Sequence, residues 1–182
     1  FPNDVFLNEG INGNTAWQVI QRLDPILQCQ PDLIILMIGT NDALGSFDIN
    51  SGLRYKKNNE LPEVPTLEKY KEHLNELIEK IGIQSKIVIC TLPPIGENVN
   101  SEVNKHVNQF NDYIKMTVTQ KNLSLMPQSV YLKNDTILKN IILYHPLDMK
   151  LVEDVIDQVQ LRDFVNSQKN GLNTNIGENG IA

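Results

Sequence analysis

The sequence predicts an α/β fold built around a parallel, doubly wound sheet. Apolar runs of strand length alternate along the chain with segments whose apolar residues recur every three or four positions. Two of these runs, "DLIILMI" (32–38) and "KIVICTL" (86–92), lack polar alternation, which is typical of strands buried on both faces of a parallel sheet. Polar segments follow these strands, and the ligands of such sheets bind beyond the carboxyl ends of the strands.

The remaining elements follow from the same periodicities. The expected strands are 4–8, 32–38, 86–92 and 123–127, and the expected helices are 15–23, 66–81, 103–118 and 149–165, with one further turn opened by Asp24 and Pro25. Segment 43–64 is polar and broken by glycine and proline, so we expect a long functional loop that lies over the pocket as a mobile lid. A chain of 182 residues is long enough for one ordinary domain, and we expect a single domain over residues 1–182.

Composition narrows the function classes. The chain has 16 basic and 22 acidic residues and a formal net charge of −6, which argues against a nucleic-acid partner. The apolar runs are too short for a membrane span, so we expect a soluble protein. Cys29 and Cys90 are far apart in sequence, and we expect two buried thiols, a weak indication of a cytoplasmic location. The sequence has no Cys/His cluster with metal-ligand spacing, so we expect no metal and no cofactor.

Two polar segments are candidates for a binding site. "NEGINGN" (8–14) follows the first expected strand, and "GTND" (39–42) follows the second. Glycines at such positions let the backbone approach a ligand, and N–H groups there can receive a developing negative charge. Gly13 can donate through its backbone and Asn41 through its side-chain amide. The alternatives are a turn glycine at Gly13 and a cap or Asx turn at Asn41.

The segments "NEGINGNTA" and "IGTND" resemble the second and third sequence blocks of the SGNH (GDSL-type) hydrolases. The resemblance covers roughly residues 4–127 and implies a flavodoxin-like, three-layer α/β/α fold that hydrolyses esters. It also implies that Gly13 and Asn41 supply two oxyanion-hole donors. We expect Asp42 to cap the following segment or to orient Asn41, and Asn12 either supports the site or forms a turn.

The family's other blocks are harder to find. The resemblance implies a nucleophilic serine in a Gly-Asp-Ser block, but the chain has no such block and begins where the family's second strand would start. We therefore expect a truncated or degenerate chain without the family's first strand. His145 in "LYHPLD" is a weak candidate for the base of the family's D-x-x-H block. The alignment that we favour instead places Asn179 and Ala182 on the Asp and His of that block.

The expected function is hydrolysis of a small-molecule carboxylic ester by an esterase, lipase or acylhydrolase. The resemblance implies a Ser-His(-Asp) mechanism with a Gly/Asn oxyanion hole, and we expect this chain to be inactive alone. Histidines 73 and 106 are expected on solvated helix faces. The alternative is a non-catalytic flavodoxin-like binding or interaction module, and the oligomeric state is open.

Overall fold

The computed structural model describes residues 5–128, 132–142 and 146–177. The chain divides into two compact units, residues 1–128 and 129–182, which are described separately. The expectation of a single domain over residues 1–182 stays a prediction.

The first unit contains a three-stranded parallel sheet in the order β1-β2-β3. Its strands are β1 (Leu33–Leu36), β2 (Lys86–Cys90) and β3 (Ser124–Met126). The register pairs Leu33 with Lys86 and Val88 with Ser124. The α/β class and the parallel sheet are confirmed, with three of the four expected strands.

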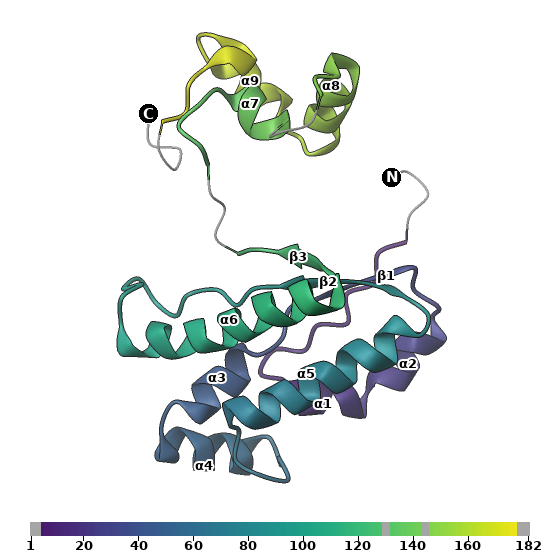
Figure 1. Cartoon of the computed structure of the whole chain (residues 1–182), viewed down its shortest axis with the longest axis vertical. Helices are drawn as coiled ribbons and strands as arrows, with labels where there is room; N and C mark the ends of the chain where they lie inside the picture. The colour runs from purple at the N-terminus through teal and green to yellow at the C-terminus, as the bar shows by residue number, and fades with distance from the viewer. Residues whose placement is uncertain (1–4, 129–131, 143–145, 178–182) are drawn as a thin grey trace. The chain divides into compact units, whose positions relative to one another are not determined.

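The helices of the first unit lie together on one side of the sheet (Figure 1). They are α1 (Ala16–Gln21), α2 (Leu23–Gln28), α3 (Thr40–Ser46), α4 (Ile49–Asn58), α5 (Leu67–Gly82) and α6 (Glu102–Lys121). On α5, the buried residues recur at helical spacing, and the Thr66 side chain caps the helix by accepting the Lys69 N–H at 3.1 Å. The Tyr70 and Phe110 rings, 4.9 Å apart, join α5 to α6 in the centre of the core.

The opposite face of β1 carries exposed apolar side chains. Leu33, Ile35 and Met37 are 48%, 57% and 57% exposed, and they alternate with the inward-facing Ile34 and Leu36. Among the described residues, β1 pairs only with β2, so its other edge has no strand partner.

The expectation of a strand at 4–8 is wrong for the residues that the structure describes. Val5, Phe6 and Leu7 form no regular structure and are 83%, 80% and 61% exposed. A strand needs a neighbour to take its backbone hydrogen bonds, and no described segment pairs with these residues.

The expectation of a loop at 43–64 is also wrong, because most of this segment lies in α3 and α4. Asp48 caps α4 by accepting the N–H groups of Asn50 and Ser51. Gly45 and Gly52 allow close packing instead of ending a helix. A Cβ on Gly52 would lie 2.4 Å from Val64 Cγ1 and 3.0 Å from the Gly45 oxygen.

The second unit is helical and has its own small core. It contains α7 (Ile137–Ile142), α8 (Met149–Gln158), α9 (Arg162–Ser167) and the 3₁₀ turn η1 (Gly171–Asn173). Val152, Ile156 and Val165 form the core. The expectation of one helix over 149–165 is wrong, because Gln160 takes a left-handed backbone conformation with φ 59° and separates α8 from α9.

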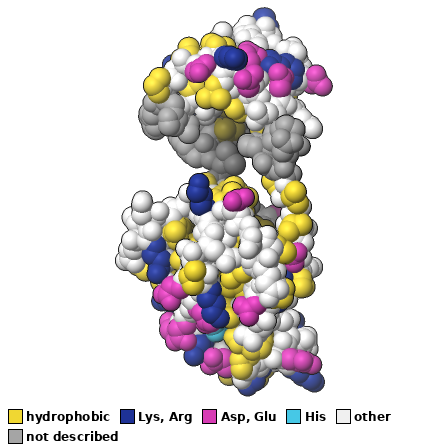
Figure 2. All heavy atoms as spheres, turned by 90° about the vertical axis from the view of Figure 1, so that its right-hand side faces the viewer, with side chains coloured by type: hydrophobic (Ala, Val, Ile, Leu, Met, Phe, Trp, Pro, Cys, Tyr) yellow, Lys and Arg dark blue, Asp and Glu magenta, His cyan; other side chains and the backbone are white. Residues whose placement is uncertain are grey.

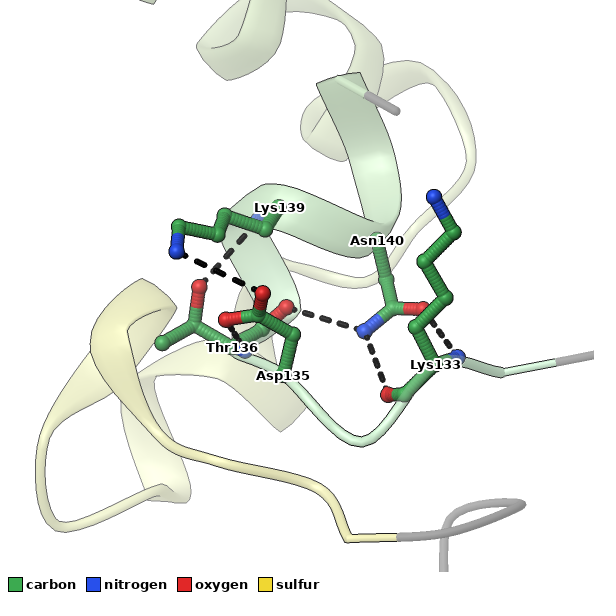
Figure 3. Close-up of polar contacts among 5 residues, drawn as sticks. All are labelled: Lys133, Asp135, Thr136, Lys139 and Asn140. Atoms are coloured by element: carbon green, nitrogen blue, oxygen red, sulfur yellow. Dashed lines mark hydrogen bonds and ion pairs between the residues drawn. The ribbon is translucent and has the colours of Figure 1, made fainter. Parts of the chain in front are cut away.

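Polar contacts shape the start of α7 (Figure 3). The Asn140 amide accepts the Lys133 N–H at 2.8 Å and donates to the carbonyls of Lys133 and Thr136 at 3.1 and 3.0 Å. The Asp135 carboxylate accepts the Thr136 N–H at 2.8 Å. Thr136 also pairs with Asn175 in an isolated antiparallel bridge, so contacts within the unit join its beginning to its end.

The surface mixes charges of both signs. On the face drawn in Figure 2, Lys and Arg side chains are interspersed with Asp and Glu, and they form no continuous basic patch.

Candidate functional site

The segment before α1 is an irregular turn that contains a glycine with positive φ. Asn8 Oδ1 accepts the Gly10 N–H at 3.0 Å, and the Asn14 N–H donates to the Ile11 carbonyl at 3.3 Å. Gly13 has φ +88°, and a Cβ there would meet no atom within 4 Å. The conformation of the backbone, not crowding, therefore favours glycine at this position. No acceptor among the described residues takes the Gly13 N–H.

The Asn41 side chain reaches this turn from the first turn of α3. Its Nδ2 donates to the Asn14 carbonyl at 3.0 Å, and its Oδ1 accepts the Tyr55 hydroxyl at 3.2 Å. The structure thus brings the first turn of α3 next to the residue that follows Gly13, although the two contacting residues are 27 positions apart. The role of Gly13 and Asn41 as oxyanion donors stays a prediction.

Gly39 sets the direction in which α3 leaves β1. It has φ +127°, and a Cβ there would lie 2.7 Å from the Tyr70 ring. The Tyr70 hydroxyl donates to the Ile38 carbonyl at 3.1 Å, so the ring closes against the backbone of this turn. Glycine is required here both for the backbone conformation and for the close approach.

The buried Asp42 side chain contacts the start of α1, and its expected role as a cap of the following segment or as a support for Asn41 stays a prediction. It lies inside α3, and its carboxylate accepts the Ala16 N–H at 3.0 Å. Burial raises the pKa of Asp42 to about 7, although the hydrogen bond from Ala16 opposes this shift. The Thr15–Gln18 capping box completes the same helix start.

A small cavity lies beside Asp42. Its volume is about 20 Å³, and its lining includes Thr15, Trp17, Asp42, Leu61 and His73. Such a volume has room for about one water molecule, so it is not the pocket for an ester. The pKa of His73 is lowered, mainly by burial, and the expectation of a solvated His73 is wrong because this half-buried ring faces the cavity.

The structure also shows a Ser–His contact that the sequence did not predict. Ser46 Oγ lies 2.8 Å from His106 Nε2, and Ser46 Oγ also donates to the Ala43 carbonyl at 3.1 Å. The His106 ring packs at 5.8 Å from the Phe47 ring and 5.4 Å from the Phe110 ring. His106 is therefore half-buried, not solvated as expected, and burial lowers its pKa.

The Ser46 hydroxyl has two acceptors within reach, the Ala43 carbonyl and His106 Nε2, and its single proton can go to only one of them at a time. The pair also lies at the carboxyl end of α3, where helix carbonyls disfavour an oxyanion. The contact therefore ties α6 to the end of α3. The spacing of 60 positions left no local sequence signal for it.

The remaining candidate residues from the sequence are Asn12, three residues outside the described ranges, and the two cysteines. Asn12 is exposed and forms none of the hydrogen bonds found among the described residues. His145, Asn179 and Ala182 lie outside the described residues. Cys90 is buried as expected, whereas the expectation of a buried Cys29 is wrong, because that thiol is exposed.

Residues 5–128, 132–142 and 146–177 contain no cluster of three or more His, Cys, Asp and Glu side chains that could hold a metal ion. In the same ranges, no helix combines the length and apolar character that a membrane crossing requires.

Comparisons with known proteins agree with the fold. The model of the GDSL-like Lipase/Acylhydrolase family matches residues 1–146. The acetylxylan esterase Axe2 from Geobacillus stearothermophilus is 20% identical with a TM-score of 0.57, over 86% of this chain and 70% of that one. A putative lipolytic protein of the G-D-S-L family from Desulfitobacterium hafniense DCB-2 is 19% identical with a TM-score of 0.50, over 71% of this chain and 67% of that one.

A second sequence similarity covers a shorter stretch of the chain. The mitochondrial iron-sulfur clusters transporter ATM1 from Debaryomyces hansenii is 40% identical over 74 residues. This stretch is 38% of the chain and 10% of the transporter. The chain therefore spans about a tenth of this curated relative.

Proposed function

Because the chain belongs to the GDSL-like lipase/acylhydrolase family, we propose that its first unit carries the oxyanion half of a carboxylic ester hydrolase site. The observation that carries this proposal is the hydrogen bond from Asn41 to the Asn14 carbonyl, which brings an amide donor next to the Gly13 turn. An amide has two N–H groups. One is used by Asn14, and no acceptor among the described residues takes the other.

The Gly13 N–H and the second Asn41 N–H would stabilise the same negative charge. Ester hydrolysis by a serine passes through a tetrahedral oxyanion, and donors held about 3 Å from that oxygen stabilise the transition state more than the planar carbonyl. In a complete enzyme, Asn41→Ala should cost roughly 100- to 1,000-fold in turnover, because the donor acts mainly on the charged intermediate.

The proposed mechanism uses a Ser-His(-Asp) triad. Variants of Axe2 described as catalytic mutants replace a serine, an aspartate and a histidine, and that protein acts on acetylxylan. This chain has no Gly-Asp-Ser segment, and within the described residues the exposed face of β1 and its edge without a strand partner support an incomplete sheet. We therefore propose that the chain alone is inactive, because losing a triad nucleophile removes on the order of 10⁶ in turnover.

Two measurements test the proposal. The purified chain should not hydrolyse nitrophenyl acetate above the buffer rate, and robust, saturable hydrolysis would contradict the proposed inactivity. Acetate, a product of such a reaction with a carboxylate oxygen, should shift the NMR signals of the Gly13 N–H and the Asn41 amide. Asn41→Ala should abolish saturation, whereas Asn108→Ala, at an exposed position of α6, should not. Shifts confined to other residues would overturn the oxyanion site.

We propose a second, separate role for the C-terminal unit, residues 129–182. The family match ends at residue 146, and the unit has its own core and its own bridge between Thr136 and Asn175. In this role the unit would be an accessory interaction module.

This second proposal predicts that loosening the C-terminal unit leaves the acetate response intact. Ile156 is fully buried in that unit, so Ile156→Ala should disturb its core. An unchanged acetate titration at Gly13 and Asn41 is the expected result. Loss of the response in this variant would show that the unit belongs to the hydrolase site.

A further inference from the structure

Hydrogen bonds hold the Asn41 side-chain amide at both its nitrogen and its oxygen. Nδ2 donates to the Asn14 carbonyl at 3.0 Å, and a carbonyl oxygen can only accept. The nitrogen must therefore face Asn14, and the amide oxygen must face α4. There the Tyr55 hydroxyl, 3.2 Å from Asn41 Oδ1, has to be the donor.

Tyr55 is itself well positioned for this contact. Its ring lies against Gly45, where a Cβ would come within 3.1 Å of Tyr55 Cγ. Its carbonyl accepts the backbone N–H of Asn59 at 3.0 Å and the Asn59 side-chain amide at 3.2 Å. Burial raises the pKa of the Tyr55 hydroxyl, so the hydroxyl stays protonated and able to donate at neutral pH.

We propose that Tyr55 is a positioning residue, which fixes the orientation of the Asn41 amide so that its second N–H is presented to an oxyanion. This inference rests on the proposed function. Segment 43–64 therefore acts on the site through α4 and one hydroxyl group. Without the hydroxyl, only the bond to Asn14 orients the amide, and its second N–H samples more directions.

The test uses a matched pair of tyrosine–asparagine contacts within the first unit. Asn75 Nδ2 donates to the Tyr113 hydroxyl at 2.6 Å, so Tyr113→Phe removes one hydroxyl from an asparagine elsewhere in the unit. Tyr55→Phe removes the other while keeping the ring against Gly45. The side-chain amide signals of both asparagines are recorded by ¹⁵N NMR on the full chain.

Tyr55→Phe should shift the Asn41 amide signals, speed their exchange with water and leave the Asn75 signals in place. Tyr113→Phe should do the reverse. Unchanged Asn41 signals in Tyr55→Phe would overturn the inference, and so would equal shifts at both asparagines, because these would indicate a general structural change.

An acetate titration separates this inference from the proposed function. Tyr55→Phe should weaken acetate binding at Asn41 by roughly 2- to 10-fold, the range expected for one lost hydrogen bond, and Tyr113→Phe should not. If acetate fails to bind the unsubstituted chain, the oxyanion site is wrong, while the amide signals still decide the role of Tyr55. Equal acetate affinity in Tyr55→Phe and the unsubstituted chain would overturn the positioning role.

Discussion

The Asp42 carboxylate accepts the backbone N–H of Ala16, which lies 26 positions earlier in the chain, at 3.0 Å. This buried contact joins the start of α1 to α3. The Gly13 turn lies just before Ala16, and Asn41 lies just before Asp42. Asp42 therefore holds together the two segments of the candidate site.

Asp42 should make stability depend on pH. Its folded pKa of about 7 lies above the ordinary aspartate pKa of 3.8, so the folded state binds more protons than the unfolded state between these values. The free energy of unfolding should fall as the pH rises from about 4 to about 7, by roughly 4 kcal/mol at most. Asp42→Asn keeps an acceptor for Ala16 but cannot ionise, so it should lack this dependence.

Urea unfolding at several pH values measures this difference. The lowered pKa values of His73 and His106 act in the opposite direction, because they reduce stability as the pH falls below about 6.5. The relevant quantity is therefore the stability of Asp42→Asn minus that of the unsubstituted chain, which should increase with pH. Parallel stability curves for the two proteins would contradict the raised pKa.

Gly39→Ala should destabilise the first unit. The substitution combines a φ of +127° with a Cβ only 2.7 Å from the Tyr70 ring, and the two costs together amount to roughly 2–5 kcal/mol. Gly82→Ala is the matched control, because its Cβ would meet only Ile87 Cδ1 at 3.9 Å. Denaturant unfolding should show a change of less than about 1 kcal/mol for the control. Equal losses would show that close approach at Gly39 is unimportant.

Asn111→Ala should lower the free energy of unfolding by more than the small loss of side-chain volume suggests. Asn111 is buried on α6, and its side chain accepts the Leu92 N–H at 2.6 Å and donates to the Leu92 carbonyl at 3.1 Å. Its removal leaves two buried backbone groups without partners, at about 1–3 kcal/mol each. Asn108→Ala, on the exposed face of the same helix, should change stability by less than about 0.5 kcal/mol. Thermal unfolding measures the stability of both variants. Similar losses of stability would show that the Leu92 contacts contribute nothing.

Ile156→Ala should destabilise the C-terminal unit without lowering protection in the first unit. Ile156 is 0% exposed, and truncation of a buried isoleucine costs about 2–5 kcal/mol. Hydrogen exchange should therefore speed up in residues 132–142 and 146–177, while β1 and β2 keep their protection. The control is Leu151→Ala, since Leu151 is 59% exposed on the same helix. Faster exchange throughout the chain would indicate one cooperative unit.

The sequence by itself determined the elements whose signals are local. The stripe of apolar residues on α5, its Thr66 cap and the apolar runs of β1 and β2 all lie within a few turns of chain, so periodicity was enough to predict them. The parallel sheet followed from the alternation of these elements. The candidate pair Gly13 and Asn41 came from the resemblance to a family together with the position of both residues after apolar runs.

Contacts between distant segments were decided only by the tertiary structure. Glycines in segment 43–64 read as helix breakers, yet Gly45 and Gly52 stay helical because α3 and α4 pack closely there. No local pattern indicates that Asp42 caps α1, that His106 meets Ser46, or that Tyr55 donates to Asn41. Such contacts form because the sheet and the helix crossings bring the backbones together, and a hydrogen bond depends on that final distance and not on sequence spacing.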